Sequence, residues 1–211
     1  AGHDLDTAVV MTLSALVELG CQTANRLLVV HGAGLALDDG RGLLLIAPGG
    51  SGKTTLAAAL NAEGYRLIND DVVPVTPDGQ LIALGTPLCL KPGSWPVLAP
   101  HRPDLAAAAT YQRYGQPVRF LAPRGPRITT PVPPGLLLFP RYQPGSAPGI
   151  EPLTPTSVLQ NLIVADAVIR NLTQAKLEAI VRWVQTAPAY ALTYPDLDSG
   201  LALVHQVLAE G

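Results

Sequence analysis

The sequence is poor in charged residues, cysteine and long apolar runs, and each shortage excludes a class of protein. Charged residues make up 14% of the 211 residues, hydrophobic residues make up 48%, and the formal net charge is −2. A disordered chain combines high net charge with few hydrophobic residues, so this composition excludes one. The chain is long enough to bury the core of one domain.

The apolar stretches are too short to cross a membrane. The longest, at 8–19 and 43–47, fall below the roughly 18 residues that a membrane-spanning helix needs. Cys21 and Cys89 lack metal-ligand spacing and suit a reducing compartment as free thiols. We therefore expect a soluble, cytoplasmic protein with no membrane or nucleic-acid partner.

Short apolar runs and turn residues predict a sheet in the first half of the chain. Residues 27–30, 35–37 and 43–46 read as strands, the last two joined as a hairpin by Asp38-Asp39-Gly40. A helix over 54–63 and a strand over 65–69 complete a β-α-β unit, so the sheet should be at least partly parallel. A second hairpin is expected from 72–75 and 81–84.

The remaining segments differ in character. Apolar spacing over 8–19 predicts an N-terminal helix that ends at Gly20. Proline and glycine recur between 101 and 134, where we expect loops, and six arginines against one acid make residues 101–141 locally basic. The C-terminal part should hold a strand at 136–139 ended by Pro140, a strand at 190–194, and three helices. Their expected caps are Thr154, Thr173 and Asp198, and their expected inward-facing residues are Val158, Leu159, Leu162, Ile163, Leu177, Ile180, Val181, Val184, Leu201, Val204 and Leu208.

These segments predict an α/β fold built as one domain over residues 1–211. Its parts are an N-terminal helix (1–25), a nucleotide-binding core (27–84), a loop-rich basic region (101–135), and a strand plus C-terminal helices (136–211). No linker or repeat divides the chain.

Residues 47–54, the candidate phosphate loop, carry the clearest chemical signal. Ala47-Pro48-Gly49-Gly50-Ser51-Gly52-Lys53-Thr54 fits the pattern G-x-x-x-x-G-K-[ST] except for alanine at its first position. The glycines let backbone N–H groups face an anion, and the following helix adds its dipole. Lys53 can then reach the β- and γ-phosphates and Thr54 can ligate Mg²⁺, with Thr55 completing the nucleotide-binding segment.

Two adjacent carboxylates form the second chemical signal. Asp70 and Asp71 follow the strand at 65–69, and ligands of open α/β sheets bind beyond the carboxyl ends of the strands. One acid can hold Mg²⁺ while the other accepts the proton of an attacking hydroxyl. The loop alone leaves NTPases, GTPases and kinases open, although no Asn-Lys-x-Asp sequence for guanine recognition is present, which disfavours a GTPase.

From His31-Gly32 through the candidate phosphate loop to Arg66-Leu67-Ile68-Asn69-Asp70-Asp71, the chain resembles the HPr serine kinase/phosphorylase family. That family is related in fold to phosphoenolpyruvate carboxykinase. The resemblance implies a P-loop kinase fold with a mixed sheet and C-terminal helices. It also implies Lys53 on phosphate, Thr54 on Mg²⁺, Asp70 as base, Asp71 at the metal, and His31 supporting the acid pair.

Two later stretches, 88–95 and 138–142, resemble smaller kinase-like relatives, some associated with peptide maturation. Lys91 and Arg141 lie there and could hold the acceptor or the transferred phosphate. The expected function is therefore a kinase that uses ATP and Mg²⁺ to phosphorylate a serine of a protein or peptide. A small-molecule kinase acting on an alcohol such as free serine and a regulatory nucleotide-binding module with weak ATPase activity are the alternatives, and the resemblance suggests a homo-oligomer.

Overall fold

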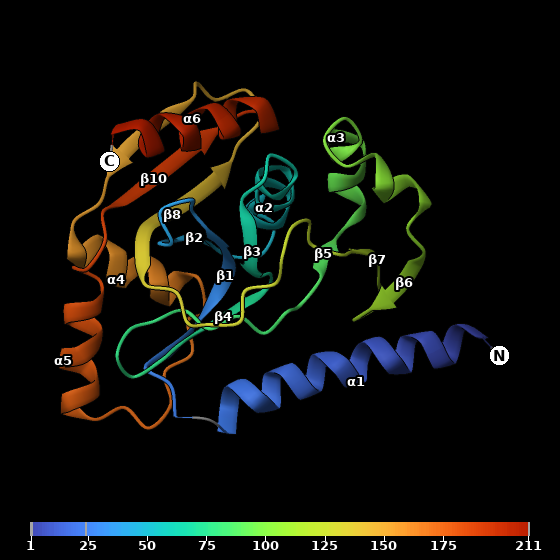
Figure 1. Cartoon of the computed structure of the whole chain (residues 1–211). Helices are drawn as coiled ribbons and strands as arrows, with labels where there is room; N and C mark the ends of the chain where they lie inside the picture. Colours follow the sequence, from blue (N-terminus) through green and yellow to red (C-terminus); the bar gives the residue numbers. More distant parts are fainter. Residues whose placement is uncertain (1, 24, 211) are drawn as a thin grey trace.

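A mixed β-sheet forms the centre of the computed structural model, which describes residues 2–23 and 25–210 (Figure 1). Six strands follow the order β3-β1-β2-β8-β10-β9, and β4 also pairs with β1. These strands are β1 (Leu28–Ala36), β2 (Gly42–Ile46), β3 (Arg66–Asn69), β4 (Val72–Val75), β8 (Pro134–Tyr142), β9 (Gly149–Pro152) and β10 (Ala189–Tyr194). A second, three-stranded sheet contains β5 (Leu88–Leu90), β7 (Gln116–Leu121) and β6 (Thr110–Arg113) in that order.

Helices connect and cover the strands. They are α1 (Gly2–Thr23), α2 (Lys53–Ala62), α3 (Trp95–Leu98), α4 (Pro155–Val164), α5 (Gln174–Trp183) and α6 (Leu197–Glu210), with 3-10 turns at Pro92–Ser94 and Pro103–Ala107. The part of the chain described here includes no helix long and apolar enough to span a bilayer.

The strand topology confirms the expected partly parallel sheet. Strand β1 pairs antiparallel with both β2 and β3, so β2 and β3 are parallel to one another with β1 between them. Strand β8 is parallel to both β2 and β10. Helix α2 therefore crosses from β2 to β3, and the loop before it opens at the carboxyl end of β2.

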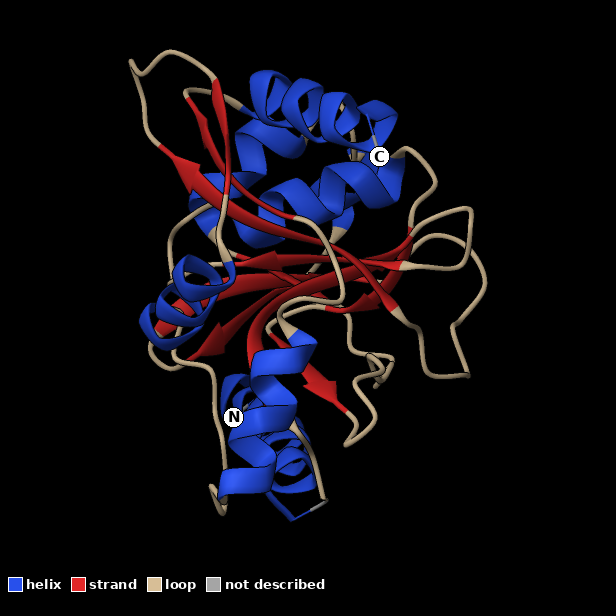
Figure 2. Ribbon diagram, turned by 90° about the vertical axis from the view of Figure 1, so that its left-hand side faces the viewer, coloured by secondary structure: helices blue, strands red, loops and turns tan. Residues whose placement is uncertain are grey.

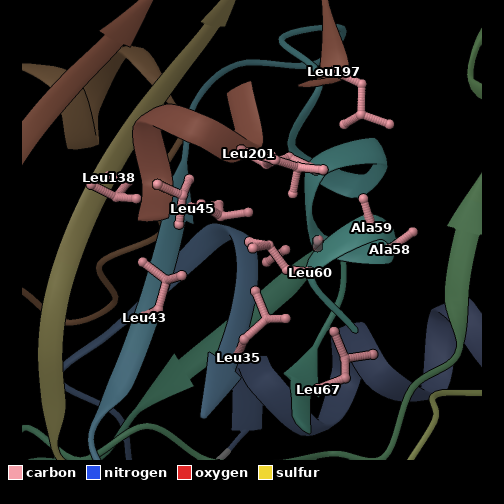
Figure 3. Packing of buried hydrophobic residues seen from close by; sticks show 14 of the residues in the cluster. Leu35, Leu43, Leu45, Ala58, Ala59, Leu60, Leu67, Leu138, Leu197 and Leu201 are labelled. Carbon is pink, nitrogen blue, oxygen red and sulfur yellow. The ribbon is translucent and has the colours of Figure 1, made fainter. Parts of the chain in front are cut away.

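Alternate residues of the strands enter two different cores. Leu43 and Leu45 pack with Leu60 of α2 and Leu201 of α6, as Figure 3 shows. Leu44 and Ile46 instead pack in a second cluster, whose helical members come from α4 and α5. Because successive side chains of a strand point to opposite faces, a run of four buried apolar residues requires cover on both faces. Figure 2 shows helices on both sides of the strand layer.

The region expected to be loops contains two paired strands. β6 and β7 form an antiparallel hairpin closed by Arg113 and Gln116, and β7 also pairs with β5. The turn residues Tyr114 and Gly115 have φ values of 51° and 73°, as the favoured two-residue hairpin turn requires. A tyrosine at the first turn position hid this signal, because asparagine or glycine is the usual residue there.

Other boundaries also differ from expectation. The runs at 27–30 and 35–37 belong to one strand, β1, and β8 continues through Pro140 to Tyr142. Past Leu138 only β10 pairs with β8, so a residue without an N–H is tolerated there. The expected hairpin between 72–75 and 81–84 forms only in part: Leu81 makes a bridge to Val75, and Ile82 N donates to Pro74 O at 2.9 Å.

The C-terminal helices begin as expected except for the last one. Thr154 and Thr173 cap α4 and α5, whereas Asp196, not Asp198, accepts the hydrogen bond of Ser199 N at the start of α6. Three residues expected to face the core are exposed instead: Ile163, Leu177 and Val181. The C-terminal part also contains β9, which the sequence did not predict. At the other end of the chain, α1 extends beyond the expected 8–19 in both directions.

Gly32 is required by a close approach between β1 and β2. A Cβ at this position would lie 2.5 Å from the carbonyl oxygen of Leu45. We expect Gly32→Ala to lower the free energy of unfolding by about 1–3 kcal/mol. Gly20→Ala is the control, since a Cβ at Gly20 in α1 meets nothing within 4 Å. This variant should raise the free energy of unfolding by about 0.5–1 kcal/mol. Urea unfolding of both variants tests this, and equal effects would contradict it.

Candidate functional site

The candidate phosphate loop lies between β2 and α2, the context its sequence requires. Gly50 and Gly52 have φ values of 85° and 91°, a left-handed conformation that other residues adopt only with strain. A Cβ at Gly49 or Gly50 would meet no atom within 4 Å, so the loop is open on that side. The backbone can therefore be approached closely by a ligand.

Two tyrosines from neighbouring strands hold the loop in place. The carbonyl oxygen of Ser51 accepts from Tyr142 N at 3.2 Å and from the Tyr194 hydroxyl at 3.4 Å. The Ser51 hydroxyl, in contrast, is buried and has no hydrogen-bond partner among the described residues. A buried hydroxyl without a partner is costly in a native fold, which points to a ligand atom that it would meet.

Lys53, the first residue of α2, folds back onto the loop. Its Nζ donates to the carbonyl oxygens of Ala47 at 2.5 Å and Pro48 at 2.9 Å, and the residue is only 7% exposed. Burial lowers the pKa of Lys53 to about 8, although the charges of Asp70 and Asp71 act in the opposite direction. The ammonium group thus lies beside the loop, and its acceptors among the described residues are carbonyl oxygens of the loop.

Asp70 is buried between the loop helix and β5. Its Oδ1 accepts from the Thr54 hydroxyl at 2.9 Å and its Oδ2 accepts from Cys89 N at 2.8 Å. The residue is 2% exposed, and burial raises its pKa to about 6 despite both hydrogen bonds. A carboxylate held this far from its ordinary pKa is characteristic of functional sites.

Asp71 points away from this contact because its backbone is left-handed, with φ of 75°. Its Oδ2 accepts from Arg113 Nη2 at 2.6 Å, and its Oδ1 lies 3.9 Å from His31 Nδ1. Burial, followed by the charge of Lys53, lowers the pKa of His31, which favours the neutral form of the imidazole. The strained residue therefore directs the two adjacent carboxylates to different partners.

Lys91 and Arg141 lie at the edges of the site and are exposed. Lys91 precedes the 3-10 turn after β5, and its charge contributes to lowering the pKa values of His31 and Lys53. Arg141 lies on β8 directly before Tyr142, which contacts the candidate phosphate loop. Thr55 follows Thr54 in the first turn of α2 and is partly buried.

Arg113 is a site residue that sequence reasoning did not single out. Besides Asp71, it contacts Cys89 Sγ through Nη1 at 3.5 Å and Ser14 Oγ through Nε at 3.2 Å. Its position depends on the β6–β7 hairpin, so the Tyr-Gly turn between two alternating segments was the signal that could have found it.

The arginines of the basic region are largely engaged within the fold. Arg102 is buried and binds Asp104, Asn61 and the carbonyl of Ala122. Arg124 also pairs with Asp104, and Arg119 stacks over Trp95 with 4.2 Å between its Cζ and the ring centroid. Together with Arg113, four of the six arginines have internal partners, so this segment contributes much less free positive charge than its sequence suggests.

Comparisons with known proteins give a distant structural likeness. No family model and no curated protein matches the sequence. Among solved structures, the HPr(Ser) kinase/phosphatase from Coxiella burnetii matches over 87% of this chain and 99% of its own, with 14% sequence identity and a TM-score of 0.36.

The raised pKa of Asp70 predicts how stability depends on pH. The folded protein binds a proton at Asp70 more tightly than the unfolded chain does, so the destabilising charge is absent near pH 4 and present above about pH 6. Asp70→Asn should therefore raise the free energy of unfolding at pH 8 by up to about 3 kcal/mol, with the gain disappearing at pH 4. Thermal unfolding across this range measures it, and a gain independent of pH would contradict the assignment.

Proposed function

We propose that the protein is a kinase that uses ATP and Mg²⁺ to phosphorylate a hydroxyl group, that of a serine in a protein or peptide. The observation that carries the proposal is the hydrogen bond between Thr54 and Asp70. It joins the hydroxyl that follows Lys53 in the loop to an acid at the end of the next strand. Phosphoryl transfer needs these two oxygen ligands beside the transferred group.

The loop residues fit a nucleotide's phosphates. The buried Ser51 hydroxyl has no hydrogen-bond partner in the described part of the chain, and a phosphate oxygen would supply one. The glycine backbone is open to a ligand. Lys53 needs only to exchange its carbonyl contacts for phosphate oxygens. That exchange would also favour its charged form, because burial in the free protein lowers its pKa to about 8.

The two acids suit different roles. Thr54 and Asp70 together offer the oxygen ligands that Mg²⁺ prefers, and Mg²⁺ would neutralise charge developing on the phosphates. Asp71, half-exposed and directed away from the loop, would accept the proton of the attacking hydroxyl, with His31 and Arg113 holding its orientation. This assignment reverses the roles that the family resemblance implies for the pair.

The finer parts of the proposal rest on the sequence. The order of motifs from His31 to Asp71 supports a kinase of the HPr kinase and phosphoenolpyruvate carboxykinase type, and the stretches 88–95 and 138–142 support the branch associated with peptide maturation. The use of ATP, the cytoplasmic location and the possible homo-oligomer belong to the same proposal.

Three variants separate the roles. Lys53→Ala should weaken ATP binding at least about tenfold, because a charge-assisted contact to phosphate is lost. Asp71→Asn should lower transfer by about 10²–10⁴-fold while leaving ATP affinity within about threefold, because only a base is removed. Asp70→Asn should raise the Mg²⁺ concentration needed for half-maximal transfer.

The measurement is transfer of γ-labelled phosphate to a mixture of serine-containing peptides or to free serine, with ATP affinity measured separately. If Asp71→Asn keeps full transfer and Asp70→Asn loses transfer completely even at saturating Mg²⁺, then Asp70 is the base. ATP hydrolysis without transfer to any acceptor would favour the regulatory module, and transfer to free serine alone would favour the small-molecule kinase.

A further inference from the structure

A cavity of about 1230 Å³ lies under α1, on the acid side of the site. Its walls come from α1, from β1 and from the β6–β7 hairpin. Figure 1 shows α1 running beneath β6 and β4, and α1 and β6 are in contact. The helix therefore forms one wall of a space whose opposite wall belongs to the sheet.

The two carboxylates separate this cavity from the candidate phosphate loop. His31, Asp70 and Asp71 line the cavity, whereas residues 47–54 are absent from the described lining. On its other side Asp70 contacts Thr54, which belongs to the loop. A hydroxyl in the cavity would thus approach the acid pair from the side away from the loop, and in-line transfer requires that it reach the γ-phosphorus opposite the leaving oxygen of ADP.

The cavity walls are mainly apolar. Val10, Leu13 and Val17 of α1 face a wall that includes Val29 and the aromatic pair Tyr111 and Phe120, whose ring centroids are 5.8 Å apart. The volume exceeds the roughly 300–1,000 Å³ of pockets that hold small ligands. Free serine would leave most of this apolar surface in contact with water, so the cavity suits a larger and more apolar acceptor.

Charged groups in the wall are close to balance in sign. Four basic residues occur with five acidic ones: Arg26, Arg113, Arg170 and Lys176 with Asp6, Glu18, Asp70, Asp71 and Asp166. This balance gives no preference for an acidic acceptor. The Nε of Arg26 is buried without a hydrogen-bond partner among the described residues, so it can donate to a peptide carbonyl oxygen.

Arg113 connects the helix to the acid pair. Its guanidinium contacts Ser14 of α1 through Nε and Asp71 through Nη2. A shift of α1 when an acceptor binds would therefore move Arg113 and change its contact with Asp71. This contact makes α1 part of the site rather than a separate appendage.

From these observations we infer that the cavity under α1 is the acceptor site and that it binds a peptide segment with apolar side chains next to the phosphorylated serine. The inference rests on the proposed kinase function. It specifies the acceptor: apolar flanks that pack against α1, with the serine hydroxyl directed to Asp71.

The chain offers a matched pair of variants on α1. Leu13 and Leu16 are both 58% exposed and lie on the same helix, but only Leu13 belongs to the described lining of the cavity. The substrates are two synthetic heptapeptides with a central serine. In one the serine is flanked by leucine and valine, and in the other by glycine and by polar residues other than threonine. The full chain, Leu13→Asp and Leu16→Asp are compared by steady-state transfer of γ-labelled phosphate, with circular dichroism and ATP affinity as measures of folding.

We expect the apolar peptide to have a KM at least tenfold below that of the polar peptide. Leu13→Asp should raise the KM of the apolar peptide at least tenfold and Leu16→Asp should leave it unchanged. Equal KM values for both peptides, or equal effects of the two variants, would overturn the acceptor site while leaving the kinase function intact. If Leu13→Asp fails to fold, Val9→Asp at a second lining position replaces it. No transfer by the wild-type chain to either peptide or to free serine, despite ATP binding, would overturn the kinase function itself.

Discussion

The burial of Asp70 is the constraint on which the rest of the site depends. A carboxylate that is 2% exposed and accepts from neutral donors, without a cationic partner among the described residues, costs stability, in line with its raised pKa of about 6. Its hydrogen bonds join three elements, because Thr54 belongs to α2, Cys89 to β5, and Asp70 itself follows β3. The same charge that weakens the fold therefore aligns the candidate phosphate loop with the second sheet.

This alignment gives the two neighbouring acids different surroundings. Asp70 faces the loop, and the left-handed backbone at Asp71 turns the second carboxylate toward Arg113 and the cavity. Asn69 stabilises the turn that carries the acid pair, because its side chain donates to Ile82 O and accepts from Leu84 N. One side of the acid pair thus suits phosphate and metal, and the other side suits an acceptor.

Local signals in the sequence predicted the strands and the helix that surround the candidate phosphate loop. Apolar runs identified β2 and β3, and the glycines with Lys53 identified the turn between β2 and α2, because each of these depends on neighbouring residues. The other side escaped prediction because it depends on long-range contacts. Arg113 is 42 residues from Asp71, and its hairpin is marked only by a Tyr-Gly turn. The basic character of 101–141 was misleading, since pairing such as Arg102 with Asp104 depends on the fold.

The most direct test of this account is a crystal structure of the protein with a non-hydrolysable ATP analogue and Mn²⁺, located by its anomalous scattering. The account predicts the β- and γ-phosphates over residues 49–54 and the metal within about 2.3 Å of Thr54 Oγ1, with Asp70 in its coordination sphere directly or through water. The terminal phosphate should face the cavity under α1. A nucleotide bound away from the loop, or a metal bound by Asp71 with Asp70 directed elsewhere, would contradict it.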